Sequence, residues 1–272
     1  MSAWEWAGPG DKARMTQVSE LPQSAPQPGA RDDVAEVVRT IFYALLITLI
    51  LRIFIFQPYT IPSPSMEPTL IEGDYLVVAK SSYGYSRHSI PFSPPLFSGR
   101  IFEQIPARGD VVVFKLPRDG RTDYVKRLIG LPGDRIQMRA GQLFINGVGV
   151  PRTSMSPVMV DDGYAPHRAA RFAEVLPNGK RYVTYDLSPD GEGDNTAVFV
   201  VPEGHYFMMG DNRDNSLDSR SPPEIGVGFV PAENLVGKAK VVLLSWSQGV
   251  AIFKPWTWVT KARTDRFLHA AQ

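Results

Sequence analysis

Thr40-Ile-Phe-Tyr-Ala-Leu-Leu-Ile-Thr-Leu-Ile-Leu51, continued after Arg52 by Ile53-Phe-Ile-Phe56, is the stretch that decides the architecture of this chain. It contains neither glycine nor proline, and as a helix rising ~1.5 Å per residue it approaches the roughly 20 residues that cross a bilayer. Arg52 is its single charge, and an arginine near a helix end can extend to the membrane interface. The pattern predicts a transmembrane helix over residues 35–57. The alternatives are a buried helix of a soluble protein and an uncleaved secretory segment.

Positive charge is distributed unevenly around this helix. The cations on its N-terminal side are Lys12, Arg14, Arg31 and Arg39. No lysine or arginine occurs between residues 57 and 79. Because positively charged flanks stay on the cytoplasmic side, we expect residues 1–34 inside and residues 58–272 outside. Residues 1–34 are rich in proline and glutamine without apolar periodicity, which predicts a disordered cytoplasmic tail.

Short β-branched segments alternate with turn signals after the helix, a pattern typical of antiparallel β proteins. The best strand candidates are residues 75–79, 111–114, 136–138, 142–145, 197–201 and 240–244, with a weaker one at 182–185. Asn146-Gly147 is a signal for a type I′ hairpin turn. We therefore predict a mainly β fold, with an antiparallel, barrel-like sheet built from about 58–140 and 197–272. A polar, glycine-punctuated stretch predicts an inserted β subdomain at about 141–196.

Composition excludes several classes of protein. Lysine and arginine total 29 against 28 for aspartate and glutamate, and the net charge of +1 gives no electrostatic reason to expect a nucleic-acid partner. The chain has no cysteine, which excludes disulfides, cysteine nucleophiles and thiolate metal sites.

Two serines follow the helix in Gln57-Pro-Tyr-Thr-Ile-Pro-Ser-Pro-Ser-Met-Glu-Pro-Thr-Leu70. Proline fixes its own φ and restricts the residue before it, so the prolines around Ser63 and Ser65 stiffen this backbone. Such a segment can present a hydroxyl group. The alternative is a proline-rich linker that leads away from the membrane.

A lysine and an arginine lie side by side among apolar residues in Asp123-Tyr-Val-Lys-Arg-Leu-Ile-Gly130. Successive side chains of a strand face opposite sides, so we expect one of Lys126 and Arg127 to point inward. A desolvated lysine can fall from a pKa of ~10.4 towards ~7 to 8, where its neutral amine acts as a general base. The alternative is a pair of surface cations on an edge strand.

Asp and Asn are dense in Gly210-Asp-Asn-Arg-Asp-Asn-Ser-Leu-Asp-Ser-Arg220, directly after an apolar run. These residue types bond their own backbone, which predicts a rigid polar loop at a strand end, where site residues often lie. An ordinary turn is the alternative, since the residue spacing does not fit an EF-hand calcium loop.

Five segments, in this order, resemble the conserved boxes of bacterial type I signal peptidases. They are Pro62-Ser-Pro-Ser-Met-Glu-Pro-Thr-Leu70, Glu72-Gly-Asp74, Arg108-Gly-Asp-Val-Val-Val-Phe114, Tyr124-Val-Lys-Arg-Leu-Ile-Gly-Leu-Pro-Gly-Asp134 and the loop from Gly210 to Arg220. Together they cover about residues 57–231 and follow an N-terminal membrane span. The resemblance implies a membrane-anchored serine endopeptidase of family S26 that cleaves signal peptides from exported preproteins.

The resemblance also implies roles for single residues. Ser65 matches the nucleophile and Lys126 the general base of a Ser-Lys dyad. Ser63 matches the side-chain oxyanion donor, and Ser216 matches the hydroxyl that orients the lysine amine. Asp218 and Arg220 match a supporting ion pair. Pocket or strand-edge residues for the substrate match Tyr59, Ile61, Met66, Leu70, Tyr124 and Val125.

What the resemblance implies for the reaction is acyl transfer through a covalent intermediate, with no metal and no cofactor. The substrate is expected to add a strand to a sheet edge, with small side chains at −1 and −3, as in Ala-x-Ala. The partners implied are signal peptides of exported preproteins and the lipid bilayer, with no nucleic acid. The implied location is the bacterial inner (cytoplasmic) membrane, crossed once by a monomer whose catalytic region is periplasmic.

Two features depart from the family's pattern. Pro64 stands between the two serines where many relatives carry glycine, which puts the oxyanion geometry in doubt. The segment from Ser221 to Pro231 is longer than the family's compact version, which affects the local loop.

Three other functions remain open on the sequence. The first is a Ser-His-Asp hydrolase, for which the available histidines are His88, His167, His205 and His269. The second is a self-cleaving repressor-type Ser-Lys protease, although such proteins carry a DNA-binding domain where this chain has a membrane span. The third is a membrane-tethered, non-catalytic periplasmic binding or assembly protein.

Overall fold

The computed structural model describes residues 30–54, 56–160, 166–247, 249–250, 254 and 256–271. The chain divides into two compact units, Met1–Leu46 and Ile47–Gln272.

Helix α1 runs from Ala30 to Phe54. Its segment Val34–Arg52 has a mean hydropathy of 2.1, so by length and composition it can cross a membrane. The helix begins and ends a few residues earlier than the predicted range 35–57. Residues 30–34 are helical, while the rest of the predicted tail lies outside the described residues. Phe56 and Gln57 are not helical, because their backbone pairs with the strand around Val78.

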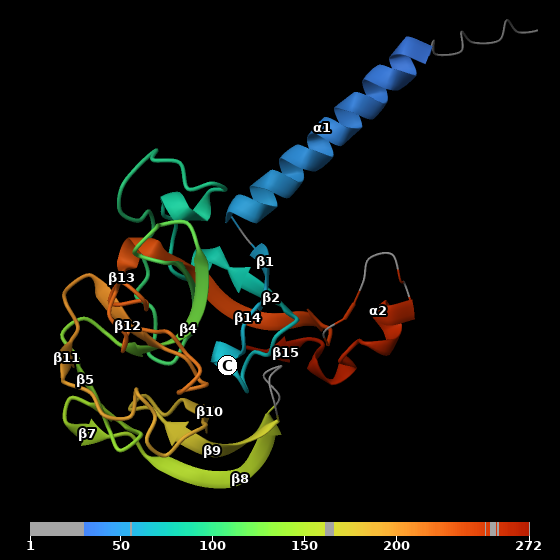
Figure 1. Ribbon diagram of the computed structural model, residues 1–272. Helices are drawn as coiled ribbons and strands as arrows, with labels where there is room; N and C mark the ends of the chain where they lie inside the picture. Colours follow the sequence, from blue (N-terminus) through green and yellow to red (C-terminus); the bar gives the residue numbers. More distant parts are fainter. Residues whose placement is uncertain are drawn as a thin grey trace, which may run out of the picture. The chain divides into compact units, whose positions relative to one another are not determined.

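Eight antiparallel strands form the main sheet (Figure 1). They are β1 (Phe56–Thr60), β2 (Asp74–Ala79), β3 (Val111–Lys115), β4 (Asp123–Gly130), β12 (His205–Met209), β13 (Val230–Pro231), β14 (Leu235–Ser245) and β15 (His269–Ala270). Their order is β1-β2-β14-β3-β4-β12-β13, and β15 pairs with β14. The mainly β, antiparallel fold predicted from the sequence is confirmed.

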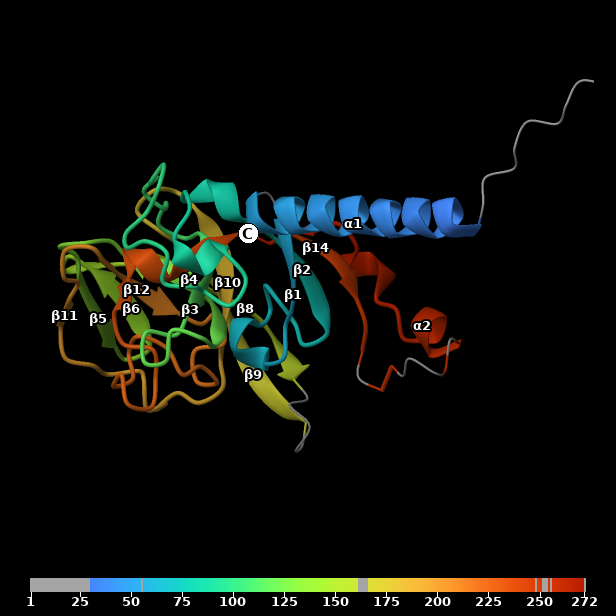
Figure 2. The same cartoon turned by 90° about the horizontal axis from the view of Figure 1, so that it is seen from above.

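Two smaller sheets are inserted between β4 and β12. One contains β5 (Arg135–Arg139), β6 (Gln142–Ile145), β7 (Val148–Gly149) and β11 (Phe199–Val200). The other contains β8 (Arg152–Val160), β9 (His167–Val175) and β10 (Arg181–Asp186). Strands β8 and β9 run side by side as a long hairpin (Figure 2). The strands outside the main sheet thus begin before residue 141 and end after residue 196, a wider span than the range expected from composition.

The Asn146-Gly147 turn joins β6 to β7 as its sequence predicts. Both residues have positive φ, 53° and 83°, which a type I′ turn requires. The strand expected at 197–201 is shorter. Thr196 bonds to Met138 and Phe199 pairs with Ile136, so this side of the ladder holds one residue more than β5 and pairing is interrupted.

A buried apolar cluster lies under the segment that follows β1. Ile61, Met66 and Leu70 pack there with residues of β2, β3 and β14, and Met66 and Leu70 are completely buried. Burial of a side chain of this size stabilises the fold by ~1.5 to 3 kcal/mol. Ala271, the penultimate residue of the chain, belongs to the same cluster, while the short helix α2 (Trp256–Thr260) exposes Trp256 and Trp258.

Candidate active site

Ser65 lies in a short 3-10 helix, Pro64–Met66, directly after β1. Pro64 occupies the first helical position, where the fixed φ of proline suits the helix and its missing N–H costs nothing. Met66 anchors the helix in the core. The proline that departs from the family's pattern therefore begins the turn that presents the serine.

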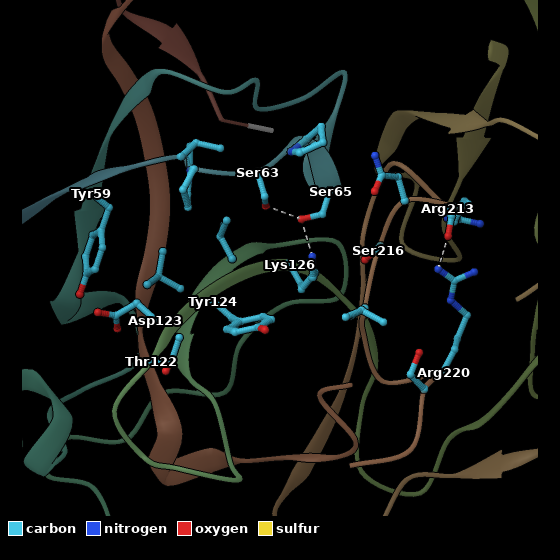
Figure 3. A pocket seen from close by; sticks show the side chains of 18 of the residues that line it. Tyr59, Ser63, Ser65, Thr122, Asp123, Tyr124, Lys126, Arg213, Ser216 and Arg220 are labelled. Atoms are coloured by element: carbon cyan, nitrogen blue, oxygen red, sulfur yellow. Dashed lines mark hydrogen bonds between the residues drawn. The ribbon is translucent and has the colours of Figure 1, made fainter. Parts of the chain in front are cut away.

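Lys126 lies on β4 and meets Ser65 in a hydrogen bond of 2.5 Å between Nζ and Oγ (Figure 3). The lysine side chain is almost completely buried. This burial lowers the pKa of Lys126 to about 8, and the nearby Asp218 carboxylate opposes only part of that effect. A substantial fraction of the amine is therefore neutral near neutral pH and able to accept a proton.

Lys126 and Arg127 are both buried, so the expectation that only one of them points inward is wrong. Their side chains do face opposite sides of β4, but the inserted sheets cover the second side. Arg127 donates from Nε and Nη2 to the two carboxylate oxygens of Asp211, at 2.8 and 2.7 Å. Thr69 also donates to Asp211, at 2.5 Å, and joins this pair to the segment after Ser65.

The polar loop from Gly210 to Arg220 is held by an ion pair within itself. Arg220 donates from Nε and Nη2 to the two oxygens of Asp218, at 2.9 Å each. Asp218 also accepts from the backbone N–H of Gly210. These bonds hold the pKa of Asp218 below its usual value despite burial, so the carboxylate stays charged near Lys126.

Two more hydroxyl groups lie near the dyad. Ser63 Oγ is 3.3 Å from Ser65 Oγ, and Figure 3 shows Ser63, Ser65 and Lys126 converging. Ser216 lines the same cleft, but its buried hydroxyl has no hydrogen-bond partner within the described part of the chain. A bond from Ser216 to the Lys126 amine is therefore not formed in this structure.

A cleft of about 1050 Å³ opens over Ser65 and Lys126. This exceeds the ~300 to 1000 Å³ of most small-molecule pockets and suits a peptide. Four of the six residues expected to contact the substrate line the cleft: Tyr59, Ile61, Tyr124 and Val125. The other two do not. Met66 and Leu70 lie in the core beneath the cleft, because the turn at Pro64 directs them inward.

Two strand edges border the cleft without a partner in the main sheet. β1 is the terminal strand and pairs with β2 alone. The first half of β4, up to Lys126, pairs with β3 on one side, whereas its pairing with β12 involves only Arg127 and later residues. Both segments line the cleft, so an extended peptide could pair with either edge.

None of the four histidines lines this cleft. His88 instead contacts Ser93, and His205 bonds to the backbone oxygen of Glu203. The structure therefore offers no His-based arrangement around Ser65.

Sequence reasoning missed two residues that hold the segment containing Ser65. Asn212 donates from its backbone N–H to the carbonyl of Ser65, at 3.2 Å, and from its side chain to the carbonyl of Pro64. Thr69 bonds to both members of the Arg127–Asp211 pair. Asn212 stands in the recognised loop, which gave a signal for it, whereas nothing in the local sequence distinguishes Thr69.

Comparison with known proteins identifies the family of this chain. The model of the family described as "Signal peptidase, peptidase S26" matches residues 34–246. The signal peptidase I of Rickettsia typhi is 42% identical over 233 residues, which cover 79% of this chain and 86% of that protein. The signal peptidase I of Rickettsia canadensis is 41% identical over 249 residues, covering 85% and 91%.

A solved structure of a signal peptidase I from Enterococcus faecalis V583 is 30% identical and covers 50% of this chain and 97% of its own, with a TM-score of 0.29. That score is too low to compare the folds in detail, so the family assignment depends on the sequence matches. The chain belongs to the signal peptidase family, peptidase S26, and is a serine endopeptidase that processes signal peptides.

Proposed function

We propose that Ser65 and Lys126 form the catalytic dyad of this peptidase. The single observation that carries the proposal is the 2.5 Å hydrogen bond between the serine hydroxyl and a lysine amine that is buried and desolvated. A nucleophile needs an adjacent base that is neutral at working pH. Lys126 is adjacent to Ser65, and because burial lowers its pKa to about 8, a fraction of its amine is already neutral at neutral pH and this fraction grows as the pH rises.

In the proposed reaction Lys126 takes the proton of Ser65 as the serine oxygen attacks the scissile carbonyl. The oxyanion that forms accepts from the hydroxyl of Ser63 and the backbone N–H of Ser65. The lysine then protonates the leaving amine, and water activated by the same amine releases the acyl group from Ser65. Ser216, which lines the cleft with its hydroxyl unpaired in the described part of the chain, would orient the amine by accepting a bond from it during the reaction, and the Asp218–Arg220 pair holds the loop that carries Ser216.

The substrate is proposed to bind as an extended strand between the edges of β1 and β4. Its backbone would pair with those edges, which are free along the cleft. Tyr59, Ile61, Tyr124 and Val125 then bound the pockets for the side chains before the cleaved bond. Bulky walls of this kind favour small residues at −1 and −3, the Ala-x-Ala pattern.

We also propose that the enzyme is a monomer in a bacterial inner membrane, with its N-terminus cytoplasmic and its catalytic region periplasmic. Four cations precede the apolar stretch that begins at Thr40, and they support this orientation. Trp256 and Trp258 are 63% and 48% exposed, and such indole rings favour the membrane interface. The inserted strands between β4 and β12 would then belong to the periplasmic region.

The test uses the purified full-length chain in detergent and a preprotein with an Ala-x-Ala site. Ser65→Ala and Lys126→Ala should each abolish cleavage, and alanine at each of the four histidines should not. A preprotein with a large side chain at −1 should resist cleavage. Equal cleavage by the parent chain, Ser65→Ala and Lys126→Ala would overturn the dyad and favour a non-catalytic role for this site.

A further inference from the structure

Strand β10 of the inserted sheets is hydrogen-bonded through its backbone to the loop of the proposed active site. The backbone N–H of Tyr185 donates to the carbonyl of Asp211, at 2.9 Å. The backbone N–H of Arg213 donates to the carbonyl of Tyr185, also at 2.9 Å. Tyr185 and Asn212 thus form a parallel bridge, which extends the sheet of β8 to β10 by one residue of the loop.

The same part of the loop contacts the nucleophile segment on its other side. Asn212, whose backbone is bridged to Tyr185, donates to the carbonyl of Ser65. A single residue therefore separates the inserted sheet from the proposed nucleophile. Any displacement of β10 would be passed to Ser65 through Asn212.

The side chain of Arg213 is buried and turns towards the inserted sheet. Its Nη2 donates to Glu174 Oε2 at 2.6 Å and to Tyr182 Oη at 3.0 Å. The Tyr182 hydroxyl in turn donates to Glu174 Oε2 at 2.5 Å. Burial alone would lower the pKa of Arg213, but the Glu174 carboxylate raises it above the usual value. Arg213 is therefore charged, and the carboxylate of Glu174 on β9 balances its charge.

Tyr182 also contacts the strand that carries the proposed base. Its ring packs against the guanidinium of Arg127, 4.4 Å from the ring centroid. Arg127 follows Lys126 on β4 and is bonded to Asp211. Tyr182 therefore contacts two arginines. Arg127 is next to Lys126 on β4, and Arg213 follows Asn212, which bonds to Ser65.

We propose that Glu174 and Tyr182 are positioning residues, which fix the inserted sheet against β4 and the loop so that Ser65 and Lys126 stay in hydrogen-bond contact and shielded from water. The proposal rests on the proposed dyad. Neither residue lines the cleft. Glu174 acts through Arg213, and Tyr182 acts through both Arg213 and Arg127. Arg213 also connects the inserted sheet to the Asp218–Arg220 ion pair, because its backbone carbonyl accepts a hydrogen bond from Arg220 at 2.6 Å.

The experiment compares Glu174→Gln and Tyr182→Phe with the parent chain, full length in detergent, on one preprotein. Glu174→Gln removes the charge that balances Arg213, Tyr182→Phe removes the hydroxyl that accepts from Arg213, and both changes leave the cleft walls intact. Because a small misplacement of reacting groups is costly, kcat should fall on the order of tenfold to a hundredfold, with KM nearly unchanged. Water admitted beside Lys126 would move its pKa back towards ~10.4, so the acidic limb of the kcat/KM profile should shift to higher pH.

Two matched variants control for loss of stability. Thr184→Val removes another buried hydroxyl from β10, one that has no hydrogen-bond partner in the described part of the chain. Asp134→Asn removes the charge of a buried carboxylate that pairs with Arg108 at 2.8 Å and bonds to Leu131 and Asn146 instead of the loop. Thermal unfolding is measured for all four variants, and neither control should shift the pH profile.

The proposal is supported if Glu174→Gln and Tyr182→Phe lower kcat and shift the acidic limb while both controls keep it. It is overturned if the two variants keep the parent's kcat and pH profile, or if Asp134→Asn shifts the profile equally at an equal loss of thermal stability. Should Glu174→Gln not fold, Tyr182→Phe decides alone, since it retains the ion pair. Activity retained by Ser65→Ala would instead overturn the dyad itself, which separates the two failures.

Discussion

Lys126 and Arg127 are adjacent on β4, equally buried, and in opposite chemical surroundings. Arg127 has two hydrogen bonds to the carboxylate of Asp211 and one to the carbonyl of Gly109. In the described part of the chain Lys126 forms no ion pair, and its amine bonds to the hydroxyl of Ser65. Burial lowers the pKa of Lys126, whereas Asp211 more than offsets burial and raises the pKa of Arg127.

The difference shows what separates a structural cation from a reactive one. A buried charge with a matched counter-ion is stable as an ion and holds elements together. A buried amine without one is stabilised by losing its proton, which makes it a base. Strand alternation sends the two side chains to different faces. Asp211 pairs with Arg127 on one of them, whereas Asp218, the carboxylate near Lys126, is already paired with Arg220.

The largest effect is expected when the base is replaced by a group that cannot lose its proton. Lys126→Arg should lower kcat by about 10⁴-fold or more, because a guanidinium stays protonated and cannot accept the serine proton. The matched exchange, Arg127→Lys, keeps a cation beside Asp211 but loses the two-point bond and the contact with Tyr182, so its loss of kcat should be much smaller, on the order of tenfold to a hundredfold. Preprotein cleavage measured by gel, with both variants folded, tests the contrast, and an active Lys126→Arg enzyme would refute the assignment of the base.

A large loss of stability is expected when the structural cation loses its partner. Asp211→Asn leaves the charge of Arg127 buried and uncompensated, and breaking such a pair costs about 3 to 5 kcal/mol. Denaturant unfolding of the variant gives this number directly. If the midpoint hardly moved, the Arg127–Asp211 pair would not be the structural counterpart of Lys126 described above.

A smaller effect is expected from pH alone. If the neutral amine of Lys126 is the active form, as proposed, kcat/KM should rise through an ionisation near pH 8 and fall by about tenfold per pH unit well below it. Arg127 stays charged throughout this pH range and therefore contributes nothing to the rise of kcat/KM with pH. A profile that is flat between pH 6 and 9 would mean that the base titrates elsewhere.

The smallest effect is a gain in stability when the reactive cation becomes apolar. At pH 7 the folded chain holds a protonated lysine at a cost, so Lys126→Met should gain about 1 kcal/mol, or roughly 2 to 4 °C in Tm. Between about 8 and the ordinary value of 10.5 the unfolded chain binds the extra proton. Stability of the parent therefore rises with pH there, and the gain shrinks. Paired melting curves at pH 7 and 10 check the sign.

The strands were predictable because their signal is local. Residues 75–79 and 111–114 are runs of β-branched and apolar residues between turn signals, and β2 and β3 occupy them within a residue. The limits of α1 were less predictable. The sequence pattern is apolar through Phe56, but pairing with Ala79 draws Phe56 into β1, and this partner lies more than 20 residues away.

The candidate site, like the fold, was predictable in part. Each motif alone left Ser65 and Lys126 close to an ordinary structural explanation, and the resemblance to a family supplied the pair. The burial of Met66 and Leu70 could not be read from that resemblance, because it depends on which way the turn at Pro64 directs them.

By itself the sequence determined the apolar helix, the β-rich body and the order of the motifs, since hydrophobicity and backbone preference act over a few residues. Only the tertiary structure decided that Lys126 reaches Ser65, that Asp211 neutralises Arg127, and that the inserted sheet contacts the loop through Glu174 and Tyr182. These contacts join residues far apart in the chain. Their effect on charge depends on which face of β4 is covered and by what, and no local pattern encodes that.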